Sequence, residues 1–343
     1  MTANTLQSIR TLYDGMKGHN YGLPDCLAFL RERMDAKPEL NFWELGAITG
    51  DTVAQIYNRC ATTQCEYCVS GYIAGEEHYR AIFGTMGIAL DYVSAEKINA
   101  DKTAYIGKVK DYIDRGLPVI VQTKMRDIPG WNSDVGTHCL IVGYEDDGAA
   151  LLLLLEGDAP VRYDTSGYID MNWLFAGEKL REVTLEELYL YAAKRMTYWL
   201  TLPQRDGMCF GSAAYRAWAE DIEGGRYEDE TVDLWGDYGV YVCNTATSGD
   251  LPLFVLRSLA EMNPAYAAYS SLADEIFELL PTENPTGGPS KLWTDLEKLG
   301  AGLSNITRDL LCDNERRTKI AALLYEYADN LDRAVELLET AIK

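Results

Sequence analysis

Two side chains that could act together as nucleophile and base lie in the first half of the chain. Cys26 follows Asp25 and begins an apolar helical pattern, and His138 opens an apolar run that is typical of a strand. A thiol enzyme needs a thiolate and a nearby imidazole that accepts its proton. The chain has three histidines, His19, His78 and His138. Few residues can therefore serve as the base, and the pair predicts cysteine catalysis.

Such a site also needs an acid that orients the imidazole and a donor that holds the oxyanion. Acidic residues flank the end of the next apolar run along the chain, 149–155, and Asp158 and Glu156 are the candidates. We favour Asp158, and Asp164 is a later alternative. Asn20 lies six residues before the cysteine and carries an amide that can donate to an oxyanion.

Each candidate also has an ordinary structural explanation. Cys26 could be a small buried hydrophobic residue at the start of a core helix. His138 could be a histidine bonded to backbone at a strand end. Asn20 and the acidic candidates are residue types that are frequent in turns. The cysteine and the histidine depend on each other, because neither catalyses without its partner.

Three further cysteines are closely spaced. Cys60, Cys65 and Cys68 form a C-x4-C-x2-C pattern, which also occurs in iron–sulfur loops that use a fourth cysteine. The next cysteine is Cys139, beside His138, and a zinc site would recruit His78 instead. We expect reduced thiols here, with no metal and no cofactor. Eight cysteines in a chain of 343 residues without an export signal do not form a disulfide framework.

The composition is that of an acidic globular protein. The chain has 53 acidic and 31 basic residues and a formal charge of −22. This charge disfavours nucleic acid and anionic membranes as partners, because both are bound through Lys and Arg. No basic and apolar leader begins the sequence, and the longest apolar run, 149–155, is too short to span a bilayer. We expect a cytoplasmic protein.

Hydrophobic periodicity predicts the elements that would position these residues. The spacing of apolar residues predicts a helix over 26–36, which Asp25 would cap and Pro38 would end. Further helices are predicted over 52–58, 74–86, 105–115 and 184–194, and strands over 117–121 and 196–202.

A hairpin should place the histidine near the acidic candidates. Two apolar runs joined by an Asp-Gly turn predict paired strands over 138–144 and 149–156. Centred on this turn, the hairpin would bring His138 opposite about Leu155 and near Glu156.

The second half of the chain changes character after Pro203. Segments with helical spacing dominate there, and a loop rich in proline and glycine covers 281–290. The helical segments are 211–223, 251–280, 291–311 and 315–341. We therefore predict an α/β domain over 1–205 and a mostly helical domain over 206–343.

With these residues in view, the chain resembles the papain-like cysteine peptidase superfamily. It looks closest to bacterial proteins related to the N-terminal domain of the butirosin-biosynthesis acyltransferase, and is more distantly similar to bacteriocin-leader peptidases. The stretches that carry the resemblance are DCLAFL, DYIDRGLPVIV, THCLIVGYEDDG and FGSAAYRAWAEDI, in this order along the chain.

The resemblance implies an α+β fold, with a papain-like helix and antiparallel sheet followed by a mostly helical C-terminal domain. Leader peptidases use a glutamine six residues before the cysteine to form the oxyanion hole, where this chain has Asn20. They usually follow the cysteine with glycine, where this chain has Leu27, and place Asp-Pro after the hairpin, where the nearest match ends at Pro160. These departures weaken the case for peptidase activity more than the case for the fold.

The predicted function is a cysteine-dependent acyl-transfer enzyme, either a hydrolase of the peptidase type or an acyltransferase. Cys26 would attack the acyl carbon, and His138 would accept and return the proton. Asp158 or Glu156 would orient the ring. Asn20 and the Cys26 amide would hold the oxyanion. A small-molecule or peptide substrate is expected, and an acyl carrier protein is a further candidate partner. The alternative is a catalytically inactive papain-like domain used for binding or assembly.

Overall fold

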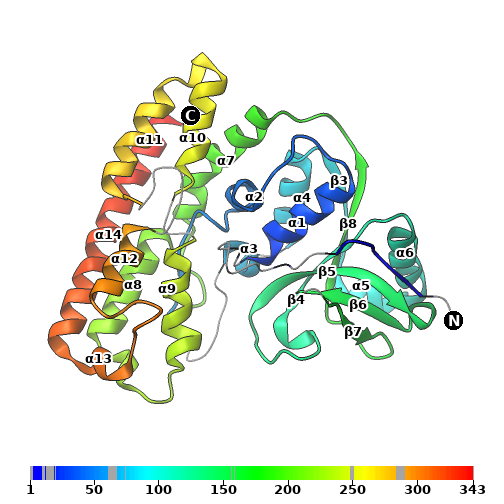
Figure 1. The fold of residues 1–343 in the computed structure, drawn as a ribbon, viewed down its shortest axis with the longest axis horizontal. Helices are drawn as coiled ribbons and strands as arrows, with labels where there is room; N and C mark the ends of the chain where they lie inside the picture. The colour runs from blue at the N-terminus through cyan, green and yellow to red at the C-terminus, as the bar shows by residue number, and fades with distance from the viewer. Residues whose placement is uncertain are drawn as a thin grey trace. The chain divides into compact units, whose positions relative to one another are not determined.

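The computed structural model shows two compact units (Figure 1). One unit comprises residues 1–49 and 70–188, and the other comprises residues 50–69 and 189–343. The predicted mixed α+β class, with an antiparallel sheet and a helical C-terminal region, is confirmed. The structure describes residues 3–9, 12, 19, 21–60, 68–73, 75–155, 157, 159–247, 251–282 and 290–342.

The first unit is built on an antiparallel sheet whose strands run in the order β3-β8-β4-β5-β6-β7, with β1 beside β5. The strand β5 is buried from Gly136 to Tyr144, so it forms the centre of the core. The strands are β1 (Asn4–Thr5), β3 (Ile88–Val93), β4 (Val119–Lys124), β5 (Gly136–Glu145), β6 (Ala150–Leu154), β7 (Val161–Asp164) and β8 (Asn172–Lys179).

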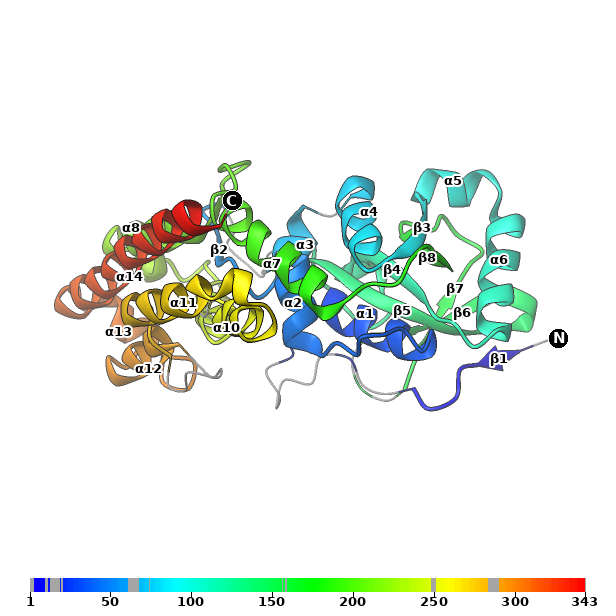
Figure 2. The ribbon, with the colours of Figure 1, turned by 90° about the horizontal axis from the view of Figure 1, so that it is seen from above.

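Helices accompany this sheet, and α1 packs against β5 and against α2 (Figure 2). Short 3-10 turns η2 (Met125–Asp127) and η3 (Asp146–Gly148) follow β4 and β5. The helices are α1 (Gly22–Arg33), α2 (Phe42–Thr49), α3 (Val69–Tyr72), α4 (Glu76–Thr85), α5 (Ala95–Ala100) and α6 (Lys102–Asp114), followed by α7 (Leu185–Leu200), which continues into the second unit.

The helix that carries Cys26 begins four residues earlier than predicted. It starts at Gly22, and its N-cap is Tyr21, which makes no side-chain cap. Pro24 is compatible with this start, because the first turn of a helix does not use the amide that proline lacks. Asp25 is therefore not the cap, and lies inside the first turn.

The predicted hairpin is present as β5 and β6. Its register pairs Leu140 with Leu154, and a bulge interrupts the ladder after Ile141. The turn between the strands needs a left-handed backbone, and Gly148 supplies it with a φ of +96°. The hairpin thus fixes the position of β5 beside β6.

The second unit is mostly helical, with a small sheet formed by β2 (Ile56–Asn58) and β9 (Met208–Phe210). No helix in the described part of the chain is long and apolar enough to cross a membrane. The further elements are α8 (Gly211–Glu223), η4 (Arg226–Glu228), the π-helix η5 (Leu234–Gly239), α9 (Val240–Thr245), α10 (Leu253–Met262), η6 (Pro264–Tyr266), α11 (Ala268–Leu279), α12 (Lys291–Lys298), α13 (Arg308–Cys312) and α14 (Asn314–Ala341).

Two predicted elements are wrong. The strand predicted over 196–202 is the end of α7, because Met196 and Trp199 continue the buried helical spacing of the segment before them. Residues 52–58 do not form the predicted helix. This segment ends in the strand β2, which pairs with β9 far along the chain. The compact units also divide differently from the predicted boundary after residue 205, since 50–69 and 189–205 belong to the second unit.

Replacing Gly148 tests how strongly the hairpin turn depends on its backbone. A Cβ at Gly148 would meet the side chain of Ile106, and its φ disfavours any other residue. We expect Gly148→Ala to lower the free energy of unfolding by about 1–3 kcal/mol in urea denaturation. The control is Gly107→Ala in α6, where a Cβ meets nothing within 4 Å. There we expect a gain of about 0.5–1 kcal/mol, and equal losses would contradict the prediction.

Candidate functional site

Cys26 is the fifth residue of α1 and is fully buried. Burial raises the pKa of its thiol well above the usual value, and the neighbouring Cys139 and Asp25 raise it further. The thiol is therefore protonated at neutral pH in this structure. Its amide also lies beyond the four at a helix start that lack a helical partner. The Cys26 amide is thus poorly placed for its predicted oxyanion role.

His138 lies near the start of β5, as predicted, with 1% of its surface exposed. Its Nε2 is 2.7 Å from the hydroxyl of Tyr79, which projects from α4. Burial, together with the charge of the nearby His78, lowers the pKa of His138 to about 3. The imidazole is therefore neutral, and a neutral imidazole has a nitrogen that can accept a proton.

The packing of α1 on β5 brings together the elements that carry the cysteine and the histidine. Among the described residues, Cys26 and His138 make no hydrogen bond with each other, and the histidine is bonded to Tyr79 instead. Cys26 and His138 are therefore both neutral, and they lie on elements that pack against each other.

The other predicted site residues are placed less fully. Asn20, Glu156 and Asp158 lie outside the described residues, and their roles stay predictions. Asp164, the later alternative, ends β7, where its Oδ1 accepts a hydrogen bond from the amide of Ser166 at 2.8 Å. This contact is that of a turn residue.

The sheet supplies two amides that the sequence analysis missed. Gln122 on β4 is paired directly with His138, and Asn172 on β8 is paired with Gln122. Directly paired residues share a face of the sheet, so the histidine and both amides form one polar row. The Asn172 amide donates to the Gln122 carbonyl oxygen. This row could not be predicted from the sequence, because it depends on which residues of neighbouring strands are paired.

A second missed feature adjoins Cys26. His19 places its Nδ1 3.1 Å from a carboxylate oxygen of Asp25. The His19 ring also stacks on Phe42, the first residue of α2, with 4.2 Å between the ring centroids. The short spacing between His19 and Asp25 was the available sequence signal.

Two of the three clustered cysteines lie within the described residues. Cys60 is exposed and Cys68 is buried, while Cys65 lies outside the described residues. In the described ranges, no group of three or more His, Cys, Asp or Glu side chains is placed to hold a metal ion.

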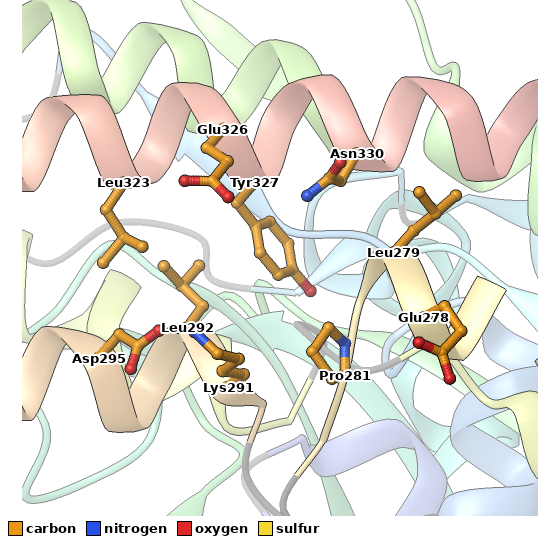
Figure 3. Close-up of a pocket in the computed structure, with 10 residues that line it drawn as sticks. All are labelled: Glu278, Leu279, Pro281, Lys291, Leu292, Asp295, Leu323, Glu326, Tyr327 and Asn330. Atoms are coloured by element: carbon orange, nitrogen blue, oxygen red, sulfur yellow. Dashed lines mark hydrogen bonds and ion pairs between the residues drawn. The ribbon is translucent and has the colours of Figure 1, made fainter. Parts of the chain in front are cut away.

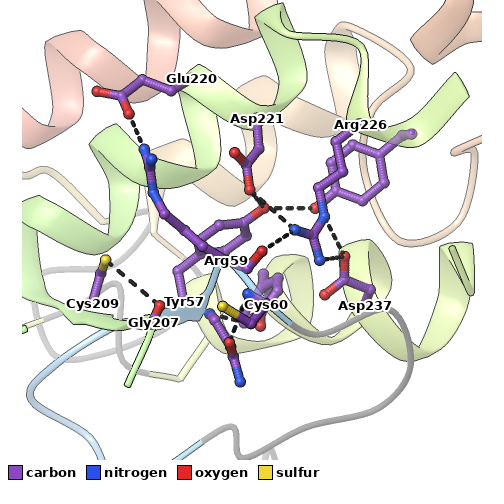
Figure 4. A network of polar contacts seen from close by, with 12 residues as sticks. Tyr57, Arg59, Cys60, Gly207, Cys209, Glu220, Asp221, Arg226 and Asp237 are labelled. Atoms are coloured by element: carbon purple, nitrogen blue, oxygen red, sulfur yellow. Dashed lines mark hydrogen bonds and ion pairs between the residues drawn. The ribbon is translucent and has the colours of Figure 1, made fainter. Parts of the chain in front are cut away.

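The second unit holds a polar network around Arg226 (Figure 4). Its guanidinium lies 3.1 Å from Asp237 and 3.3 Å from Asp221. The hydroxyl of Tyr57 donates to Asp221 at 2.8 Å and lies 3.3 Å from the hydroxyl of Tyr227. One cation is thus shared by two carboxylates, and the full burial of Asp237 in the π-helix η5 favours the protonated form of its carboxyl.

The same unit has an open pocket of about 220 Å³ between α11, α12 and α14 (Figure 3). Apolar and charged side chains both line it, and Lys291 is paired with Asp295. The residues that line it are Glu278, Leu279, Pro281, Lys291, Leu292, Asp295, Leu323, Glu326, Tyr327 and Asn330. None of them is a thiol or an imidazole, so the predicted chemistry does not involve this pocket.

Comparison of the sequence with models of known protein families finds no match, and no curated protein matches it.

Removing the hydroxyl of Tyr79 tests the contact that holds His138. Tyr79→Phe leaves the buried Nε2 of His138 without its partner, so we expect a loss of about 1–3 kcal/mol in the free energy of unfolding. Tyr168→Phe is the matched control, because that ring is 62% exposed. Its effect should stay within about 0.5 kcal/mol. Equal urea midpoints for both variants would contradict the structural role of the contact.

The pH dependence of stability tests the second unit. Burial raises the pKa of Asp237 to about 7, although Arg226 opposes this, while an unfolded aspartate titrates near about 3.9. Between these values the folded state keeps a proton that the unfolded state loses. The contribution of Asp237 to the free energy of unfolding therefore falls as pH rises from about 4 to about 7.

Asp237→Asn removes this dependence, since asparagine does not titrate and Asp221 still pairs with Arg226. Relative to the wild type, the variant should gain stability as pH rises, by up to about 4 kcal/mol near pH 8. Urea unfolding at several pH values measures the difference. The exposed Asp309→Asn serves as control. A difference in stability between variant and wild type that does not change with pH would contradict this assignment.

Proposed function

We propose that the first unit is a papain-like, cysteine-dependent acyl-transfer enzyme in which Cys26 is the nucleophile and His138 the base. The observation that carries the proposal is the packing of α1 on β5, which places the helix of the cysteine against the strand of the histidine. The lowered pKa of His138 works against the role of base while the ring is buried, so the proposal requires an opening that exposes the ring and restores its basicity.

The chemistry that we propose runs in two steps. The Cys26 thiol gives its proton to His138, and the sulfur attacks the acyl carbon of an ester, thioester or amide. The bond to the leaving group breaks, the leaving group takes the proton from the imidazole, and an acyl-enzyme remains. Water as acceptor then gives hydrolysis, and an amine gives acyl transfer. Gln122, which shares a sheet face with His138, joins Asp158 and Glu156 as a candidate for orienting the ring.

A second candidate function is binding or assembly without catalysis, in a papain-like domain that has lost its chemistry. The burial of both side chains favours it. Cys26 is fully buried with a raised pKa, and the Nε2 of His138 is engaged by Tyr79. A substrate must reach the sulfur, so catalysis requires an opening that exposes Cys26.

Acylation by a small thioester separates the two functions. The protein is incubated with S-acetyl-N-acetylcysteamine near pH 7.5, and acetylation of each cysteine is followed by peptide mass spectrometry. For an enzyme we expect Cys26 to be acetylated faster than the exposed Cys60 and Cys312. His138→Gln should slow this acetylation about 100-fold, the usual contribution of a general base.

The matched control is His78→Gln, which removes the neighbouring histidine and should leave the acetylation of Cys26 nearly unchanged. Hydrogen exchange of β5 in each variant shows whether the strand stays folded. Acetylation of Cys26 that is slower than that of Cys60, and insensitive to His138, would support binding without catalysis.

A further inference from the structure

The ring of His138 is held at one of its two nitrogens by Tyr79. The hydroxyl of Tyr79 lies 2.7 Å from Nε2 of His138, and both side chains are buried. The Tyr79 ring meets the imidazole edge-on, with 5.7 Å between the centroids, and stacks on Tyr92 of β3. A phenol packed against two rings in the core cannot turn away without repacking. Nε2 is therefore engaged by Tyr79, and Nδ1 is the ring nitrogen left to take a proton from Cys26.

The contact between Tyr79 and His138 is compatible with two tautomers of the imidazole. A neutral imidazole carries one proton, and a tyrosine hydroxyl can donate or accept. If Nε2 donates to Tyr79, Nδ1 keeps a lone pair that can take up a proton. If Tyr79 donates to Nε2, the proton of the ring lies on Nδ1, and neither nitrogen can accept one from a thiol. The direction of this hydrogen bond therefore decides whether His138 can act as a base.

Two hydrogen bonds on the sheet fix the orientation of the Gln122 amide. The backbone N–H of Ala95 donates to Oδ1 of Asn172 at 2.9 Å, and a backbone N–H can only donate. The NH2 group of Asn172 therefore points away from Ala95, and it donates to Oε1 of Gln122. Gln122 is left with its own NH2 group, which makes no hydrogen bond to another residue that the structure describes.

This NH2 group belongs to the residue that is paired with His138 across β4 and β5. Directly paired side chains project from the same face of a sheet and begin about 4.5–5.5 Å apart. Because Tyr79 engages Nε2, Nδ1 is the nitrogen open to Gln122. A donor beside Nδ1 favours a lone pair there and disfavours a second N–H, since two N–H dipoles that face each other repel. Gln122 therefore favours the tautomer in which Nε2 carries the proton.

We propose that Tyr79 and Gln122 are positioning residues that hold His138 in the tautomer with its proton on Nε2, so that Nδ1 is the base. This inference rests on the proposed function, because it names the nitrogen that serves the same reaction. The S–H bond of Cys26 breaks as an N–H bond forms at Nδ1, and the leaving group later takes that proton. Two neutral groups thus orient the ring, a role for which the sequence predicted a carboxylate.

Ring ¹⁵N NMR of the full-length chain tests the proposal, because the two tautomers of a neutral imidazole give different nitrogen shifts. The chain has three histidines, and His138→Gln assigns the signals of His138 by their disappearance. Near pH 7.5 we expect the Nε2–H tautomer to exceed the other about tenfold, as one additional hydrogen bond allows. An excess of the Nδ1–H tautomer in the wild-type protein would overturn the proposal.

Two substitutions of Gln122 test the role of its amide. In Gln122→Glu the group beside Nδ1 is a carboxylate, which accepts where the amide donates. The ratio of tautomers should therefore shift about tenfold toward Nδ1–H. Gln122→Met keeps a side chain of similar length without a polar group, and should reduce the excess of the Nε2–H tautomer several-fold. A ratio that stays unchanged in both variants would show that Gln122 does not position the ring.

Tyr79→Phe tests the other partner of the ring. Loss of the acceptor should lower the excess of the Nε2–H tautomer about tenfold. The matched control is Tyr92→Phe, which also keeps its ring and loses a hydroxyl that bonds to no described residue. Its ratio should equal that of the wild type, and hydrogen exchange of β5 shows whether each variant is folded. Equal shifts in Tyr79→Phe and Tyr92→Phe would mean that ring packing sets the tautomer, and would refute the role of the Tyr79 hydroxyl.

The failure of the proposed function is a separate result. If acetylation of Cys26 does not depend on His138 while the ring shows the expected tautomer, catalysis fails and the hydrogen-bond assignment stands. If acetylation depends on His138 and the ring carries its proton on Nδ1, the enzyme stands and the roles given to Tyr79 and Gln122 are wrong.

Discussion

Burial of β5 from Gly136 to Tyr144 obliges every polar group on this strand to find a partner inside the protein. The backbone of β5 is satisfied by β4 and β6, and in part by β1. The His138 ring bonds to Tyr79, which the helix α4 provides. The hairpin turn at Gly148 joins β5 to β6, and α1 packs against β5, so both features help to fix the position of this buried strand. The positions of the candidate site residues on β5 therefore depend on the packing of the buried sheet.

The two units handle buried ionisable groups in different ways. In the first unit, burial keeps Cys26 and His138 neutral, since an isolated charge in a low dielectric is costly. In the second unit, Arg226 stays charged because Asp221 and Asp237 surround it. A thiol with a raised pKa and an imidazole with a lowered pKa do not exchange a proton while both stay buried. Chemistry in the first unit would therefore require an opening that exposes both groups to water.

Local patterns were enough to predict a region of mixed helices and strands followed by a helical region, the hairpin, and the elements that carry Cys26 and His138. Their signals are continuous periodicity and turn residues, which act over a few positions. Local patterns could not predict the contacts that define the site, because Tyr79 and His138 are 59 residues apart in the chain. The membership of 50–69 in the second unit likewise follows from the pairing of β2 with β9. The end of α7 was mistaken for a strand, since its β-branched and aromatic residues favour strands while its buried spacing is helical.

The depth of Cys26 in α1 determines what an active state must change. A sulfur in the second turn of a helix gains less from the dipole than one at the first amides, so the thiolate needs help from nearby charges. The charges of Cys139 and Asp25 work against it, but burial is the largest cause of the raised pKa of the thiol. Exposure of Cys26 to water would therefore lower that pKa most. An active state would have to expose the sulfur, because the same movement admits the substrate and favours the thiolate.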